Sequence, residues 1–192
     1  MNLLKEINDY QPYNQQEAAD KEIILHFLAN YDDILERTNR IAHITSSCWI
    51  LNHAHDKVLM AYHKIYDSWA WLGGHNDGES DCLKVAIKEA KEESGIGNIK
   101  PLSEEIYSIE VLSVDSHLKR GEYVPTHLHL NVTYLLEADD SEKLVIKEDE
   151  NSGVAWFSND EVMVRSSEEW FKKNIYAKLI DKTNEYLKMH KL

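Results

Sequence analysis

The chain has 192 residues, with 21 Lys and Arg against 34 Asp and Glu and a net charge of −13. A chain of this length can bury a core without disulfides or metals, and its acidity argues against binding to a nucleic acid polymer through a broad basic face. Only two cysteines, Cys48 and Cys82, are present, and the sequence has neither a secretory pattern at its N-terminus nor an apolar run that could cross a membrane, so we expect a cytoplasmic protein without a membrane partner.

Residues 1–40 are predicted to form a helical arm. Apolar side chains recur there at spacings of three and four, from Ile23 to Leu35, as on one face of a helix. We expect this arm to pack on the main domain, residues 41–192. Its apolar face could instead pack against a second copy of the chain, so a homodimer stays an open alternative.

The main domain is expected to begin with two strands, 43–51 and 57–63, which are rich in β-branched and apolar residues. A loop at 73–78 follows, in which glycines stand among Asn and Asp residues. A helix is then expected to begin near Ser80 or Asp81, both good N-cap residues, and to run to about Ser94, with Gly95 as the residue just after the helix.

Two longer strands, 106–118 and 123–137, are expected next, with a turn at 120–121 between them. A charged loop leads to a short strand at 154–157, and an amphipathic helix is predicted over 168–189. Strands and helices that alternate in this way predict an α/β or α+β fold with helices covering a sheet. The pattern leaves a parallel and a mixed sheet as alternatives.

The helix that follows the glycine loop carries three closely spaced carboxylates. Glu89, Glu92 and Glu93 lie at positions i, i+3 and i+4, so their side chains can converge on one point. They could be a solvated helix surface, because like charges at these spacings cost only about 0.2–0.5 kcal/mol per pair. They could also hold a divalent cation, since the glycine loop can fold back beside them and Mg²⁺ takes oxygen ligands.

The segment 73–96 resembles the signature of the Nudix hydrolase family. Two positions depart from that signature, because Ser80 stands in place of its first glutamate and Lys88 in place of its arginine. A histidine before the first strand and a GGHxDG loop further resemble one subgroup, and the resemblance covers roughly residues 40–165. The positions that match in register are Gly74, Glu89, Glu92, Glu93, Gly95 and Ile96.

The resemblance implies an α/β fold of the Nudix type, an α/β/α sandwich around a mixed sheet with an N-terminal helical extension. It implies a pyrophosphohydrolase that cleaves a diphosphate linkage in a small nucleoside diphosphate derivative by attack of water on phosphorus. Two alternatives stay open. A Nudix-fold regulator would bind a nucleotide without turnover, and an isopentenyl diphosphate isomerase would isomerise a diphosphate instead of cleaving it.

The resemblance also implies roles for individual residues. The cofactor is expected to be Mg²⁺ or Mn²⁺, held by the carboxylates of Glu89, Glu92 and Glu93 and by the backbone carbonyl of Gly73. Such ions lower the pKa of the attacking water. Lys88 joins the three glutamates as a predicted catalytic residue that orients the metal-binding helix, although lysine lacks the rigid fork of arginine.

The group that takes the proton from the attacking water is left open. Glu92 and Glu93 are candidates on the helix itself. The acidic loop at 138–152 offers Glu148 and Glu150 as further candidates, although an exposed hydrophilic loop is the plainer interpretation of that segment.

Gly74, His75, His127 and His129 are predicted to bind the substrate. His127 and His129 share one face of a strand, and their imidazoles could donate hydrogen bonds to a phosphate or pair with it when protonated. A zinc-binding pair and plain packing are the alternatives for these two histidines. Stacking on a nucleobase competes with ordinary packing for Tyr62, Tyr66, Trp69, Trp71 and Tyr123.

Overall fold

The computed structural model describes residues 3–119, 121–147 and 151–192. The chain divides into two compact units, and each is built from three stretches of sequence. Each unit is therefore held together by contacts between segments that are distant along the chain. The first unit comprises Met1–Ser47, Gly73–Ala86 and Ser103–Tyr134, and the second comprises Cys48–Leu72, Ile87–Leu102 and Leu135–Leu192.

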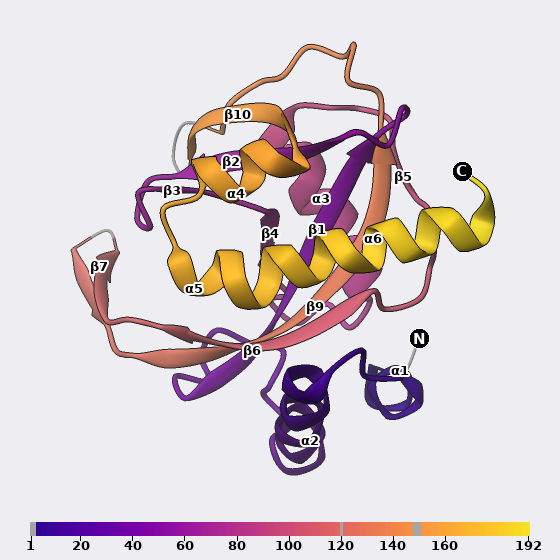
Figure 1. Cartoon of the computed structure of the whole chain (residues 1–192). Coiled ribbons are helices and arrows are strands. Elements are labelled where there is room, and N and C mark those ends of the chain that lie inside the picture. The colour runs from indigo at the N-terminus through magenta and orange to yellow at the C-terminus, as the bar shows by residue number, and fades with distance from the viewer. Residues whose placement is uncertain (1–2, 120, 148–150) are drawn as a thin grey trace. The chain divides into compact units, whose positions relative to one another are not determined.

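The first unit combines the N-terminal helices with strands. Strands β6 and β9 pair antiparallel in this unit, from Ser108 opposite Thr133 to Val114 opposite His127. The chain between β6 and β9 forms a short antiparallel hairpin of strands β7 and β8 (Figure 1). Its elements are α1 (Leu3–Asp9), α2 (Gln15–Asn30), β4 (Leu72–His75), β6 (Ser108–Val114), β7 (His117–Lys119), β8 (Glu122–Val124) and the first residues of β1 (Ala42–Asn52), of α3 (Cys82–Ser94) and of β9 (His127–Ala138).

The N-terminal arm consists of helices α1 and α2, and α2 packs on strand β6. The carboxylate of Glu17 is completely buried and accepts hydrogen bonds from the Tyr10 hydroxyl at 2.6 Å and the Ser108 hydroxyl at 2.8 Å. A buried carboxylate is tolerated only when such donors satisfy it. The sequence pattern extended the helix to Leu35, but α2 ends at Asn30 and the chain then turns. The boundary between an arm at 1–40 and a main domain at 41–192 stays a prediction.

The second unit holds most of the C-terminal part of the chain. Strand β2 pairs antiparallel with both β10 and β3, and β5 pairs antiparallel with the end of β9. The larger sheet has the strand order β10-β2-β1-β9-β5. The elements of this unit, besides the ends of β1, α3 and β9, are β2 (Lys57–His63), β3 (Ser68–Ala70), β5 (Ile99–Pro101), β10 (Asn151–Ser158), α4 (Asn159–Arg165), α5 (Glu169–Phe171), the π-helix η1 (Lys172–Tyr176) and α6 (Ala177–His190).

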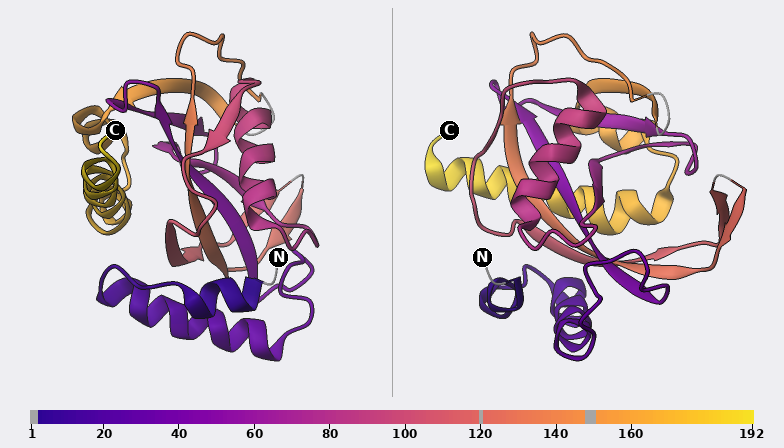
Figure 2. Two further views of the ribbon diagram at one scale, coloured as in Figure 1. Left: turned by 90° about the vertical axis from the view of Figure 1, so that its right-hand side faces the viewer. Right: turned by 180° about the vertical axis from the view of Figure 1, so that it is seen from behind.

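Helices lie on both sides of the strands in the second unit. Successive side chains of a strand point to opposite faces, and β1 shows this alternation. The indole of Trp49 stacks on the ring of Tyr176 with centroids 6.0 Å apart. The pKa of the neighbouring Cys48 is instead raised in part by the charges of two glutamates on α3. Figure 2 accordingly shows α6 and the end of α3 on opposite sides of these strands.

The C-terminal helix differs from the single helix predicted over 168–189. It forms as α5, the π-helix η1 and α6 in succession. A π-turn adds a residue to the helical repeat and shifts which side chains face inward. Helical spacing predicts an apolar stripe that includes Trp170, Ile175 and Leu179. Ile175 and Leu179 are fully buried, but Trp170 is 52% exposed.

Three other expectations about local structure need correction. The first part of the expected glycine loop is strand β4. The strand expected over 106–118 is divided into β6 and β7, and the strand expected over 123–137 is divided into β8 and β9. The sequence analysis also missed α4, although its start carries a readable signal. Ser158 and Glu161 form a capping box, in which each side chain bonds the backbone N–H of the other.

The fold class is as predicted: an α/β fold with a mixed sheet, helices flanking it and an N-terminal helical extension. None of the helices in the described parts of the chain is both long and apolar enough to cross a membrane.

Candidate functional site

Helix α3 forms as the sequence predicted, from Cys82 to Ser94. At its start the Asp81 carboxylate accepts a hydrogen bond from the backbone N–H of Lys84 at 3.0 Å, as an N-cap does. At its end Gly95 has a φ of 75°, and a Cβ there would lie 2.6 Å from the Cβ of Val145. Only glycine fits that position, so both ends of the helix are fixed by local chemistry.

The buried face of α3 is rotated from the predicted one. Helical spacing predicts that Leu83, Ala86, Ile87 and Ala90 share the core face. Ala86 and Ala90 are buried, but Leu83 and Ile87 are only half-buried. Two glutamates occupy the inward face instead, because Glu89 and Glu93 are 8% and 5% exposed. These carboxylates are therefore held away from bulk water, which a purely solvated helix surface does not explain. They share that face with Cys82, Val85, Ala86 and Ala90.

Two lysines neutralise the carboxylates of α3. The Lys88 ammonium lies 3.1 Å from a Glu89 oxygen and 3.5 Å from a Glu92 oxygen. Lys147, from the loop before β10, lies 3.5 Å from the other Glu92 oxygen and 3.9 Å from the other Glu89 oxygen. The hydrogen bond to Glu89 raises the pKa of Lys88. Sequence reasoning missed Lys147, since nothing in its local pattern distinguishes it from the other charges of its loop.

Glu93 lies on the inward side of the same helix. Its Oε1 accepts a hydrogen bond from the Asn151 side-chain amide at 3.3 Å. Burial, and after it the charges of Glu93 and Glu89, raises the pKa of the Cys48 thiol. The three glutamates with Lys88 and Lys147 form what we call the acidic helix site. Its donor atoms are carboxylate oxygens, which fit a hard divalent cation such as Mg²⁺ or Mn²⁺.

The glycines before α3 belong to the first unit, where β4 pairs with β1. A Cβ on Gly73 would lie 2.6 Å from the Cα of Ser47 and 2.7 Å from the Ser46 carbonyl oxygen. Glycine is therefore required by close approach of two backbones. The turn beyond β4 is held by Arg37, whose guanidinium bonds both carboxylate oxygens of Asp77 at 2.6 and 2.5 Å.

Four histidines of the first unit gather in one place, and we call them the histidine cluster: His43, His75, His127 and His129. The ring centroid of His43 lies 5.1 Å from that of His75, 4.9 Å from that of His127 and 5.0 Å from that of His129. Burial lowers the pKa of His43, so its imidazole is neutral at pH 7. The sequence analysis had singled out the other three members but assigned no role to His43.

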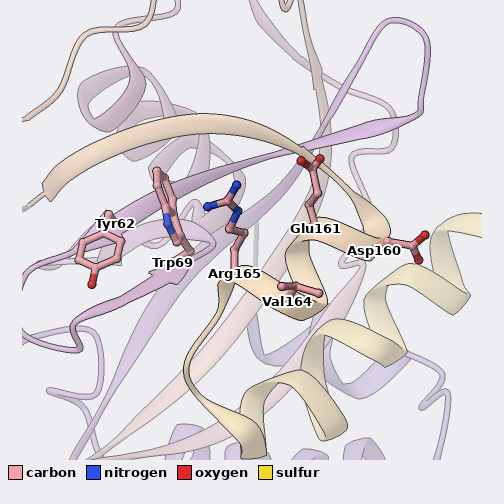
Figure 3. A pocket seen from close by; sticks show the side chains of 6 residues that line it. All are labelled: Tyr62, Trp69, Asp160, Glu161, Val164 and Arg165. Carbon is pink, nitrogen blue, oxygen red and sulfur yellow. The ribbon is translucent and has the colours of Figure 1, made fainter.

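A cavity of about 500 Å³ opens in the second unit between β2, β3 and α4. Tyr62 and Trp69 contribute aromatic rings to it, and Arg165 contributes a guanidinium (Figure 3). The remaining lining residues are Asp160, Glu161 and Val164, so no member of the acidic helix site lines it. Of the other aromatic candidates, Trp71 packs on Tyr176 and Tyr123 is 63% exposed.

The predicted site residues thus fall into two groups. Lys88, Glu89 and Glu92 are brought together by ion pairs in the second unit. His75, His127 and His129 are brought together in the first unit, where Gly73 and Gly74 lie on β4. The roles assigned to all of these residues stay predictions. Glu148 and Glu150, the loop candidates for the general base, lie outside the described residues.

Comparison with known proteins gives a family match and several structural neighbours. The model of the NUDIX domain family matches residues 41–179. A hydrolase of the NUDIX family from Clostridium perfringens superposes with a TM-score of 0.54 at 21% identity, covering 75% of this chain and 97% of its own. The dihydroneopterin triphosphate pyrophosphohydrolase of E. coli has a TM-score of 0.55 at 14% identity, with coverages of 72% and 95%. No curated protein matches the sequence significantly.

A third neighbour, an Ap4A hydrolase from C. elegans, has a TM-score of 0.51 at 16% identity and covers 75% of this chain and 97% of its own. At these identities the neighbours establish the fold alone, an α/β fold with a mixed sheet flanked by helices. The family match covers well over half of the chain, so the protein belongs to the Nudix family. It is a Nudix hydrolase, a pyrophosphohydrolase. The closer resemblance to the GGHxDG subgroup stays a prediction.

Proposed function

We propose that this protein is a Mg²⁺- or Mn²⁺-dependent hydrolase that cleaves the diphosphate linkage of a small nucleoside diphosphate derivative by attack of water on phosphorus. The observation that carries the proposal is the burial of Glu89 and Glu93 on the inward face of α3. Carboxylates are rarely buried unless they are paired or bind a metal. Here they sit on the helix whose signature defines the family.

The acidic helix site is suited to an exchange of cations. The ammonium groups of Lys88 and Lys147 compensate the charges of Glu89 and Glu92, with nitrogen–oxygen distances of 3.1–3.9 Å. Lysine is flexible and strongly hydrated, so a divalent cation can displace it from the carboxylates. When bound, Mg²⁺ or Mn²⁺ would neutralise the diphosphate and lower the pKa of the attacking water.

In this proposal Glu89, Glu92 and Glu93 hold the ions, and the Gly73 carbonyl adds a further oxygen. Glu92 or Glu93 accepts the proton of the attacking water, and Glu92 is the more accessible of the two because 43% of its side chain is exposed. Lys88, whose ammonium contacts Glu89 and Glu92, is proposed to orient the helix that carries these carboxylates.

The substrate is proposed to be a small phosphorylated nucleoside compound. Two of the structural neighbours are named as an Ap4A hydrolase and as a dihydroneopterin triphosphate pyrophosphohydrolase, and the first name supports a nucleoside compound. Gly74, His75, His127 and His129 are proposed to contact the substrate in this chain. Two free thiols, Cys48 and Cys82, suit the reducing cytoplasm that we propose as its location.

The test is turnover by the purified full-length chain on a panel of nucleotide sugars, dinucleoside polyphosphates and nucleoside triphosphates, with Mg²⁺, Mn²⁺ or a chelator. We expect cleavage with either ion and none with the chelator. Reaction in ¹⁸O-labelled water should place one labelled oxygen in a phosphate product, because water attacks phosphorus. Label in an alcohol product instead would contradict that step.

Tight binding of a nucleotide without any product would favour the regulatory alternative, and an isomerised diphosphate would favour the isomerase. Cleavage that survives complete removal of divalent ions would overturn the metal dependence.

A further inference from the structure

The histidine cluster offers ring nitrogens, whereas the acidic helix site offers oxygens. Ligand atoms of His43, His75 and His129 all lie within 4.8 Å of one another. Two nitrogens that ligate one tetrahedral zinc ion at about 2.0–2.1 Å are ~3.4 Å apart. Each pair of ligand atoms would therefore have to approach by at most about 1.4 Å to reach ligating distance. The three residues lie on β1, β4 and β9, and strands position ligands more precisely than loops do.

The imidazole of His43 provides a second, independent observation that points to a ligand. Its side chain is only 4% exposed. Its Nδ1 lies 3.0 Å from the Asn39 carbonyl oxygen, which can only accept, so Nδ1 carries the proton. Its Nε2 is buried without a hydrogen-bond partner among the residues that the structure describes. An unsatisfied buried nitrogen costs about 1–3 kcal/mol, and ligation of a metal by its lone pair would remove that cost.

His127 determines which ring nitrogen of His129, a second member of the cluster, carries a proton. Its Nδ1 lies 2.8 Å from the Pro125 carbonyl oxygen and therefore carries the proton, so the Nε2 of the neutral ring is an acceptor. The Nε2 of His129 lies 3.2 Å from that acceptor and must be the donor. Hydrogen bonds that set the tautomer of a ligating histidine in this way are typical of metal sites.

We infer that His43, His75 and His129 bind a first-row transition-metal ion, with Zn²⁺ as the expected occupant. Imidazole nitrogen suits Zn²⁺, whereas Mg²⁺ prefers oxygen. Three protein ligands leave a fourth position for water or an anion. The inference does not depend on the proposed function, since the ions at α3 need none of these histidines.

The test is binding of Zn²⁺ and of Co²⁺, its spectroscopic substitute, to the full chain freed of metal. We expect one ion per chain by dialysis and elemental analysis, visible absorption bands typical of four-coordinate Co²⁺, and no displacement by excess Mg²⁺. His75→Asn, at a half-exposed position, and His43→Asn, at a buried one, should each weaken Co²⁺ binding by more than about 100-fold. Circular dichroism would check that both variants fold.

His53→Asn is the matched control, because His53 lies in the second unit with 57% of its side chain exposed. It should bind Co²⁺ as the parent chain does. Wild-type affinity in folded His75→Asn would overturn the inference, as would complete displacement of Co²⁺ by Mg²⁺. Loss of the four-coordinate spectrum in Glu93→Gln would equally overturn it, because that result would assign the ion to the carboxylates.

Discussion

The acidic helix site and the histidine cluster differ in their donor atoms and in how their charge is managed. At α3, carboxylates are compensated by Lys88 and Lys147. In the cluster, His43 is kept neutral by burial, and its lone pair has no partner in the described part of the chain. The first arrangement suits a hard cation that exchanges with lysine, and the second suits a softer cation that binds neutral imidazole. The two proposals therefore assign different metals to the two sites on the basis of their ligand atoms.

The largest effect is expected from Glu93→Gln. Loss of a charged oxygen on the buried face of α3 should reduce turnover by at least about 10²-fold. Binding of Co²⁺ by the histidine cluster should stay unchanged, which would separate the two sites. Glu104→Gln, at an exposed position, is the control. Near-normal turnover in Glu93→Gln would contradict the role assigned to Glu93.

His127→Ala should weaken Co²⁺ binding by about 10- to 100-fold, because His127 accepts the hydrogen bond that sets the tautomer of His129. His127→Gln keeps an acceptor and should restore much of the affinity. Co²⁺ titrations of both variants measure this. Equal losses in the two would show that the ring packs but does not position His129.

Lys147→Met should strengthen Mg²⁺ binding about fivefold, because it removes a cation that competes for Glu89 and Glu92. That factor corresponds to about 1 kcal/mol. Isothermal titration with Mg²⁺ measures it, and Lys143→Met, at an exposed position of the same loop, is the control. Weaker binding in Lys147→Met would mean that Lys147 supports the ion instead of competing with it.

The first unit should lose stability in alkali through Cys82. Burial raises the pKa of this thiol from 9.0 to about 11. A raised pKa in the folded state gives stability that is complete below pH 9 and is lost as the pH rises through 11. From pH 8 to pH 10 the loss should be about 1 kcal/mol. Urea unfolding at both pH values should show a smaller loss in Cys82→Ala than in the parent chain.

Ser80→Glu should change turnover least, by no more than about twofold. It restores the first glutamate of the family signature at an exposed position just before α3. Steady-state kinetics on the best substrate of the panel would measure it. A collapse of activity would show that the signature had been placed in the wrong register.

Much of the fold could be predicted from residues that are close together in the sequence. The ends of α3 follow from Asp81 and Gly95, a cap and a residue in the left-handed conformation, and strand β2 has the predicted limits. The single helix predicted at the C-terminus was less accurate, because the π-helix η1 alters the helical repeat on which the apolar pattern depends. Helix α4 was missed although its capping box is visible in the sequence.

The sequence by itself determined the spacing of Glu89, Glu92 and Glu93 and the pairing of His127 with His129, because helical and strand periodicity act over a few residues. Only the tertiary structure decided that Lys147 meets the α3 glutamates and that His43 meets His75 and His129. Those partners are distant in the chain, and no local pattern encodes which strand or loop comes beside another. Burial of side chains from separate segments selects such contacts.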